Sequence, residues 1–296
     1  NKNGKAIRSS VELSENEILD ARFGQGKAKL SVKSKNEDRI KQFYTHFYHS
    51  LIHPNIVSDI NGEYMGADFK IHKAKENREQ YSSFSVWDTY RTQGQLIAML
   101  FPKKSSDMMQ SLVDFAEQAG GYGRWILANI ETGIMQGDPT PILISNSYAF
   151  GGDDFDLETA YRYMKKGALI PRLYSQKQEV RPYLEEYISN GHTFASMSLE
   201  YASADFAIAQ FALNAVKNEE DYKYFKNRSQ NWKNNYNSKT KWLNSKFPNG
   251  IWKDKTHDWR EGTYKNYFWM VPHNLNKLID TIGGASFAEK RLDSLF

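Results

Sequence analysis

One glutamate stands among aromatic residues in the segment DWREGTYKNYFWMVPH, residues 258–273. Glu261 precedes a glycine, and rings lie on both sides of it in the sequence, at Trp259, Tyr264, Tyr267, Phe268 and Trp269. A carboxyl group held against rings loses hydration, which penalises the charged form, and a general acid at neutral pH needs that penalty. Gly262 permits backbone angles closed to other residues, so we expect Glu261 in a sharp loop or at a helix entry.

A plainer role for Glu261 is equally compatible with the segment. A glutamate at a helix N-terminus is stabilised by the helix dipole without any part in chemistry. The neighbouring positive charges of Arg260 and Lys265 would also favour the ionised form if they point toward the carboxyl group. The sequence leaves the choice between these roles open.

A second group of polar and aromatic residues lies in SVWDTYRTQGQLIAMLFP, residues 85–102. Trp87 and Asp88, close to Tyr90 and Arg91, could form an aromatic platform beside an acceptor for sugar hydroxyls. Aromatic faces suit the flat C–H face of a sugar ring. Alternatively, Asp88 caps the apolar helix that follows, and Trp87 belongs to the core.

A third candidate is the stretch GGYGRWILANIETGIMQGDP, residues 120–139. Its glycines and weak periodicity predict a site-forming loop that carries Trp125 and Glu131. The acidic cluster FGGDDFD, residues 150–156, lacks the alternating ligands of a calcium loop, so we interpret it as helix capping. His273 could be a ligand or a base, although a packed histidine after a proline is commoner.

Composition narrows the class of protein. The 296 residues are 40% hydrophobic, enough to bury a substantial core. A net charge of +4 is spread along the chain, and no zinc, helix-turn-helix or RNA-recognition signature occurs, so we expect no nucleic-acid partner. The absence of cysteine excludes disulfides and thiolate chemistry. No apolar run approaches the roughly 18 residues that a membrane span needs.

Helical periodicity with capping residues dominates the chain past residue 36. It predicts helices over 37–52, 105–121, 138–152, 156–167, 181–191, 198–216, 219–236, 273–282 and 286–296. Strand signals are confined to 30–34, 56–60 and 250–254. We therefore predict an all-α fold in which paired helices form a toroid over residues 37–296, preceded by a linker, residues 1–36, with a short irregular or β segment.

Five segments occur in an order that resembles one known family. They are FYTHFYHSLIHPNIVSDINGEYMG, SVWDTYRTQ, GRWILANIETGIMQGDP, SLEYASADFAIAQFA and EGTYKNYFWMVPHN. This order is similar to that of the calcium-dependent exo-acting α-mannosidases of glycoside hydrolase family 92, over about residues 40–296, and WDTYRT is its most specific part. The resemblance implies a β-sandwich followed by an (α/α)6 catalytic toroid, cleavage of α-linked mannose with inversion, and a calcium ion that grips the sugar hydroxyls.

The resemblance also implies roles for individual residues. Glu261 matches the general acid of the family, while Trp87 and Asp88 match its pair at the mannose-binding subsite. Trp125 and Glu131 lie in the segment that helps to line the pocket, and His273 joins the expected substrate-binding residues.

Two departures from the family pattern bear on the calcium ion and its surroundings. Lys265 and Asn266 stand where the family usually has Trp-Gln, and Asn274 stands where it usually has Asp. Because that Gln belongs near the calcium region, Asn266 is our candidate metal ligand.

The second carboxylate of an inverting glycosidase is not found in the chain. Such an enzyme needs a base roughly 6.5 to 9.5 Å from the acid. In the family, a G-N-D-D stretch supplies the base and a G-N-E stretch supplies calcium contacts, and neither stretch occurs here. We therefore expect a toroid truncated at its C-terminal end and an isolated chain without activity. Its expected partners are mannose-containing glycans, an N-terminal β-sandwich and a C-terminal segment of the same protein.

Two other functions remain compatible with the sequence. One is a catalytically inactive carbohydrate-binding helical domain, and the other is a structural helical module whose rings all belong to the core. The chain begins with Asn1 rather than Met, as it would after removal of a signal peptide or an upstream domain. We expect a periplasmic or extracellular location.

Overall fold

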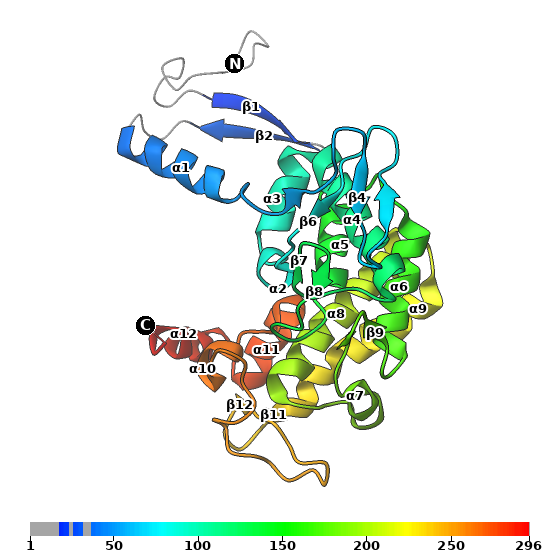
Figure 1. Cartoon of the computed structure of the whole chain (residues 1–296). Coiled ribbons are helices and arrows are strands. Elements are labelled where there is room, and N and C mark those ends of the chain that lie inside the picture. Colours follow the sequence, from blue (N-terminus) through cyan, green and yellow to red (C-terminus); the bar gives the residue numbers. More distant parts are fainter. Residues whose placement is uncertain (1–17, 24–25, 32–36, 296) are drawn as a thin grey trace.

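The computed structural model describes residues 18–23, 26–31 and 37–295 (Figure 1). Most of the expected linker, and residues 32–34 of the strand expected at 30–34, lie outside these residues. In the described part, β1 (Ile18–Phe23) pairs antiparallel with β2 (Gly26–Ser31), with Leu19 opposite Leu30. The short β segment predicted before residue 37 is therefore present.

Helices are the main secondary structure of the described chain, as the periodicity predicts. The longer ones are α1 (Glu37–His49), α3 (Gln93–Leu100), α4 (Pro102–Ala119), α5 (Thr140–Ala149), α6 (Leu157–Leu169), α7 (Leu184–Asn190), α8 (Ala195–Asn214), α9 (Glu219–Arg228), α11 (Leu275–Ile282) and α12 (Ala285–Asp293). Short helical turns are α2 (Val86–Thr89), η2 (Ser229–Asn235), α10 (Tyr264–Tyr267) and η3 (Pro272–Asn274). The helix predicted over 219–236 is thus divided, because a 3-10 segment follows Arg228.

Past residue 37, the strands of the described chain form five short antiparallel pairs. They are β3 (Asn55–Ile56) with β6 (Tyr81–Ser82), β4 (Glu63–Met65) with β5 (Ile71–Lys73), β7 (Ile126–Leu127) with β8 (Ile130–Glu131), β9 (Tyr174–Ser175) with β10 (Gln178–Glu179), and β11 (Tyr236–Asn237) with β12 (Trp242–Leu243). The strand predicted at 56–60 shortens to β3, and that at 250–254 to a single bridge between Trp252 and Lys246. Each of these pairs is a separate two-stranded sheet, so the pairs stabilise the loops between the helices.

The helix α8 is the centre of the fold. The small and apolar residues of α8 lie on every side of the helix, and most of its residues are buried, as expected for a helix without a solvent face. It packs against α5 and α6 and against α9, while α3 packs on α5 and α4 (Figure 1). This succession of packed helices agrees with the helical toroid that the sequence predicts.

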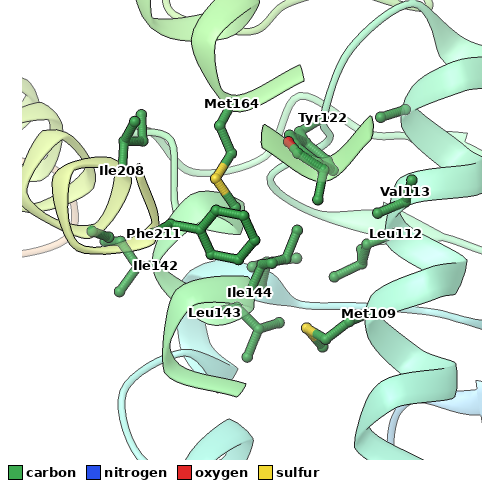
Figure 2. Packing of buried hydrophobic residues seen from close by; sticks show 14 of the residues in the cluster. Met109, Leu112, Val113, Tyr122, Ile142, Leu143, Ile144, Met164, Ile208 and Phe211 are labelled. Atoms are coloured by element: carbon green, nitrogen blue, oxygen red, sulfur yellow. The ribbon is translucent and has the colours of Figure 1, made fainter. Parts of the chain in front are cut away.

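The two larger hydrophobic clusters of the described chain meet at α8. In the first, Phe211 and Ile208 of α8 lie close to Met164 of α6 and Ile144 of α5, with Leu112 and other residues of α4 beyond them (Figure 2). The second joins Leu199 of α8 to the C-terminal part of the chain through Trp232, Phe268, Val271, Leu278 and Ile282. The first cluster fixes the C-terminal half of α8, and the second fixes its N-terminal half, against residues from distant parts of the chain.

Capping follows the sequence in several places. Asp156 begins α6 by accepting a hydrogen bond from the backbone N–H of Thr159 at 3.0 Å, and Asn218 begins α9 in the same way. α4 ends at Gly120, whose φ of 93° suits glycine. The interpretation of the acidic cluster as capping is confirmed at Asp156, while Asp153 and Asp154 are exposed.

Candidate active site

Three segments far apart in sequence meet at the N-terminal half of α8. The indole N–H of Trp87, on α2, donates to Oε1 of Glu200 at 3.0 Å. The turn at Gly137 lies against the same glutamate, since a Cβ added to this glycine would stand 2.8 Å from Cβ of Glu200. Gln136 donates to the hydroxyl of Tyr267 at 3.3 Å. The meeting point of these segments is therefore the buried carboxyl group of Glu200.

The Glu200 side chain is 1% exposed and has three polar neighbours. Besides Trp87, the Tyr90 hydroxyl donates to Oε2 at 3.5 Å, and a terminal nitrogen of Arg91 lies 4.0 Å from Oε1. Burial raises the pKa of Glu200 to about 7, and the charge of Arg91 together with the two hydrogen bonds opposes this rise. The carboxyl group is thus placed to change its charge near neutral pH.

The side chains of Trp87 and Arg91 form a stack next to Glu200. The guanidinium carbon of Arg91 lies 4.3 Å from the Trp87 ring centroid and 4.8 Å from that of Tyr90. Its Nη1 donates to the sulfur of Met270 at 3.5 Å. Trp87 is half-buried. Because Arg91 lies over its ring, one face of the expected sugar-binding platform is partly covered. Asp88 is exposed and lies within α2, and the N-cap of the apolar helix that follows, α3, is Thr92, so the expectation that Asp88 caps that helix is wrong.

The hairpin of β7 and β8 carries Trp125 next to this stack. The backbone N–H of Trp87 donates to the Arg124 carbonyl oxygen at 3.4 Å, which brings the hairpin beside α2. Glu131 turns inward: Oε2 accepts from the backbone N–H groups of Arg124 and Trp125, and Oε1 accepts from that of Gly133. Burial raises the pKa of Glu131, against the Arg124 charge and these hydrogen bonds. Glu131 therefore supports the loop that carries Trp125.

Glu261 lies in a sharp loop, as predicted, but not among rings. Its φ is 48°, a left-handed value, and its side chain is exposed. The expected burial of the carboxyl group is wrong, because the backbone takes the place near the ring. A Cβ added to Gly262 would stand 3.0 Å from the Tyr267 ring. Tyr267 and Phe268 belong to the second cluster, whereas Glu261 is exposed.

The Glu261 loop still adjoins the Glu200 site through Tyr267. The Tyr267 hydroxyl accepts a hydrogen bond from Gln136, the neighbour of Gly137. The Tyr267 ring also lies 5.4 Å from that of Trp259, two residues before Glu261. The loop and the Trp87 stack are thus parts of one region.

His273 is held on both ring nitrogens. Nε2 lies 2.9 Å from the Ser229 carbonyl oxygen, and Nδ1 lies 3.2 Å from the Ser203 hydroxyl. A carbonyl oxygen only accepts, so Nε2 carries the proton and Nδ1 accepts from Ser203. Burial lowers the pKa of His273. His273 is therefore a packed histidine, the commoner of the roles considered from the sequence.

His273 also lines a cavity of about 580 Å³ between α3, α5 and α8. Phe206, Met270 and Ile142 make much of its wall apolar, and Tyr90 and Arg91 connect it to the Glu200 site. The cavity therefore adjoins the stack.

Comparison with known families decides the identity of the fold. The sequence profile of the glycosyl hydrolase family 92 catalytic domain matches residues 27–296. The chain belongs to glycoside hydrolase family 92. A comparison with curated protein sequences gives no match.

Solved structures of family 92 enzymes resemble the chain. The α-mannosidase BT3965 from Bacteroides thetaiotaomicron aligns with a TM-score of 0.76 and 29% identity over 86% of this chain. Its complex with mannoimidazole aligns with a TM-score of 0.75. The inverting mannosidase BT2199 from Bacteroides thetaiotaomicron VPI-5482, with a TM-score of 0.76 and 24% identity over 87% of this chain, shows the fold alone. These likenesses confirm the helical toroid fold.

The family 92 chain is much shorter than these structures. It covers 35% of the length of BT3965 and 36% of that of BT2199. The fold and family are therefore established for this chain, whereas the activity of a whole protein is a matter for proposal.

The expected calcium ligand does not fit a metal site in the family 92 chain. Oδ1 of Asn266 accepts from the backbone N–H and the hydroxyl of Thr263, at 2.6 and 2.9 Å, in a capping box that begins α10. Across residues 18–23, 26–31 and 37–295, no three His, Cys, Asp or Glu side chains gather to hold a metal ion. Calcium binding by the described residues is therefore not supported by their donor set.

Sequence reasoning missed Glu200. The segment SLEYASADFAIAQFA is predicted as a helix and belongs to the family motifs, but Glu200 is not among the site residues predicted from the sequence. One signal was available, because a carboxyl group on a helix with small and apolar residues on all sides must be buried, and a buried carboxyl needs polar partners. The identity of those partners could not be read from the family 92 sequence alone.

Proposed function

We propose that this chain carries part of the catalytic region of a glycosidase that removes terminal α-linked mannose from glycans. Membership of glycoside hydrolase family 92 and the likeness to α-mannosidase BT3965 support this proposal. The observation that carries it is the convergence of the Trp87 stack, the Trp125 hairpin and the Glu261 loop at one end of α8. A sugar bound there would contact rings and hydrogen-bonding groups together, the combination that carbohydrate sites need.

In this proposal Glu261 is the general acid. Its carboxyl group is exposed in a loop with a left-handed backbone, so a substrate oxygen can reach it. The acid donates its proton to the glycosidic oxygen as the bond to the anomeric carbon breaks, and a water molecule attacks that carbon from the opposite face. The base that activates this water is expected outside the chain, and the calcium ion stays a prediction.

The role of Glu261 is tested by changing the leaving group. In the full-length protein, Glu261→Gln should lower the turnover of an α-mannoside with a poor leaving group by about 10²- to 10⁴-fold, because proton donation is lost. The turnover of a dinitrophenyl α-mannoside should fall far less, because its dinitrophenolate leaving group departs without a proton. Glu220→Gln, at an exposed site in the first turn of α9, is the control. Unchanged turnover of the poor substrate by Glu261→Gln would rule out the assignment.

The exposed position of Glu261 favours one alternative, a helical domain that binds sugar without cleaving it. Mannose titrations followed by tryptophan fluorescence, with and without calcium, separate the two functions. Binding without hydrolysis by the full-length protein would support the alternative. Hydrolysis that depends on Glu261 would exclude it.

A further inference from the structure

Glu200 is a buried charge at the centre of the site with no role in the proposed chemistry. At 1% exposure it cannot touch a sugar, so it is not a catalytic residue. We propose that Glu200 is a positioning residue that holds Trp87 and Arg91 as one unit and so presents the Arg91 guanidinium to a hydroxyl group of the bound sugar. The sugar-facing part of this inference rests on the function proposed above.

The first step is the orientation of Trp87. An indole N–H is a donor only, and the single hydrogen bond from Trp87 to Oε1 of Glu200 is 3.0 Å long. Rotation of the half-buried ring would break this bond and leave the Glu200 oxygen without its closest donor. The carboxyl group therefore sets the rotation of the ring.

The second step places Arg91 on that ring. Its guanidinium lies over Trp87, at 4.3 Å from the ring centroid, and contacts the sulfur of Met270 through Nη1. Nη2 lies 4.0 Å from Oε1 of Glu200, so the negative charge attracts the arginine toward the stack. A guanidinium has five N–H donors, and the Arg91 side chain is 37% exposed. Donors therefore remain for a hydroxyl group of a ligand.

The third step is the support beneath the carboxyl group. Gly137 has a φ of 79°, and its backbone lies so close that an added Cβ would stand 2.8 Å from Cβ and 3.2 Å from Oε2 of Glu200. The carboxyl group cannot move away from the stack in this direction. Glu200 is thus enclosed by the turn on one side and by Trp87 and Tyr90 on the other.

The protonation state of Glu200 should alter the stack. The groups that face the carboxyl are Trp87, Tyr90 and Arg91 from α2 and the residues after it, and Tyr267 from α10. Burial raises the pKa of Glu200 to about 7, so the charge is lost as the pH falls through neutrality. A neutral carboxyl group still accepts from Trp87 but no longer attracts Arg91. The hold on Arg91 should therefore weaken at acidic pH.

Tryptophan fluorescence tests the first part of this inference without any need for activity. The wild-type chain should show a fluorescence change centred near pH 7 between pH 5 and pH 9. Glu200→Gln, which keeps an acceptor oxygen but no titrating charge, should abolish this change. Trp87→Phe should abolish it too, and thereby assign the signal to one of the seven tryptophans. Glu220→Gln is the matched control and should retain it. A change that persists in Glu200→Gln would overturn the proposal.

Mannoside binding tests the second part. At pH 8, Glu200→Gln and Arg91→Lys should each weaken binding about tenfold, because a charge-assisted hydrogen bond to the sugar is lost or misplaced. The double variant should be little worse than either single variant, since both changes remove the same contact. In the full-length enzyme, a weaker initial contact should raise KM more than it lowers kcat. Wild-type affinity of Arg91→Lys at pH 8 would overturn the proposal even if Glu200→Gln fails to fold.

Failure of the proposed function gives a different result. The wild-type protein would then bind no mannoside at any pH, while the fluorescence change near pH 7 would still depend on Glu200 and Trp87. This outcome would overturn the presentation of Arg91 to a sugar and support the coupling of Glu200 to Trp87.

Discussion

Glu200 and Glu261 have the same side chain and opposite surroundings. Glu200 is enclosed on a helix without a solvent face, whereas Glu261 extends into solvent from a loop with a left-handed backbone. A carboxyl group with a pKa near neutrality, as a general acid needs, is found at the first position, but it is too deeply buried to meet a substrate. At the residue scale, the exposed carboxyl group is the one open to a ligand, as the proposed function requires, whereas the buried one contacts only its neighbours in the fold.

The raised pKa of Glu200 predicts a pH-dependent stability. Its value of about 7 in the folded chain exceeds the ordinary 4.5, so the stabilisation is fully present below pH 4.5 and is lost as the pH rises through 7. Between pH 5 and pH 8 the wild-type chain should lose on the order of 3 kcal/mol more unfolding free energy than Glu200→Gln. Urea denaturation at both pH values measures the difference. Equal losses in the two proteins would contradict the prediction.

Gly137 should tolerate no side chain. Gly137→Ala adds a Cβ against Glu200 at a left-handed φ, and should cost more than the roughly 1 kcal/mol of a strained backbone alone. Gly250→Ala is a matched control, because its φ is 83° and an added Cβ would meet nothing within 4 Å. Urea denaturation compares the two variants. If both lose the same stability, the contact with Glu200 has no energetic weight.

At the scale of elements, a buried ionic network joins four parts of the helical layer. Asp205 of α8 binds Arg181, which precedes α7, at 2.8 Å, and Arg228 at the end of α9 at 2.6 Å. Arg181 also binds Asp138, before α5, at 2.7 Å. Burial alone would raise the pKa of Asp205, but the charges of Arg228 and Arg181 hold it below its usual range. The network therefore fixes the axial position of α8, and with it that of Glu200.

Removal of the central charge should be severely destabilising. Asp205→Asn leaves two buried guanidinium groups without their counter-charge and should cost about 3 to 5 kcal/mol. Arg162→Met breaks a surface ion pair with Glu117, in which both side chains are about half exposed. It should lower the unfolding free energy by about 1 kcal/mol or less. Denaturant midpoints with unchanged slopes measure both effects. A small effect of Asp205→Asn would show that the helices hold their positions without the network.

At the scale of the whole molecule, the helix α1 exposes its aromatic rings to solvent. None of the residues of α1 is buried, and Phe43 and Tyr48 are 62% and 66% exposed. The Phe47 ring, by contrast, stacks on the Phe101 ring, with the two ring centroids 6.3 Å apart. Clustered exposed rings favour association with another surface. Among the described residues, no helix is long and apolar enough to cross a membrane.

Replacing the outward rings should alter association and not folding. The double change Phe43→Ser with Tyr48→Ser should lower self-association at high concentration, measured by light scattering, and change the unfolding free energy by about 0.5 kcal/mol or less for each site. Leu112→Ala, at a fully buried site, is the contrasting control and should cost about 2 to 5 kcal/mol. Unchanged scattering in the double variant would show that these rings do not mediate association.

The helices could be predicted from the sequence because their causes are local. Apolar spacing places α4, α6 and α8, and Asp156 and Gly120 mark ends that the structure confirms. The division of the helix predicted at 219–236 was not predictable in this way. It depends on Trp232 entering the second cluster, a contact with distant residues.

The candidate site was predictable only in part. The order of motifs in the sequence was enough to identify the family and to select Trp87, Trp125 and Glu261, since motif residues can be recognised one segment at a time. Tertiary structure decided which groups face each other: the partner of Trp87 lies 113 positions away at Glu200, and Glu261 turns from the rings beside it in sequence. Burial and charge coupling depend on such long-range neighbours, which helical periodicity and local spacing do not encode.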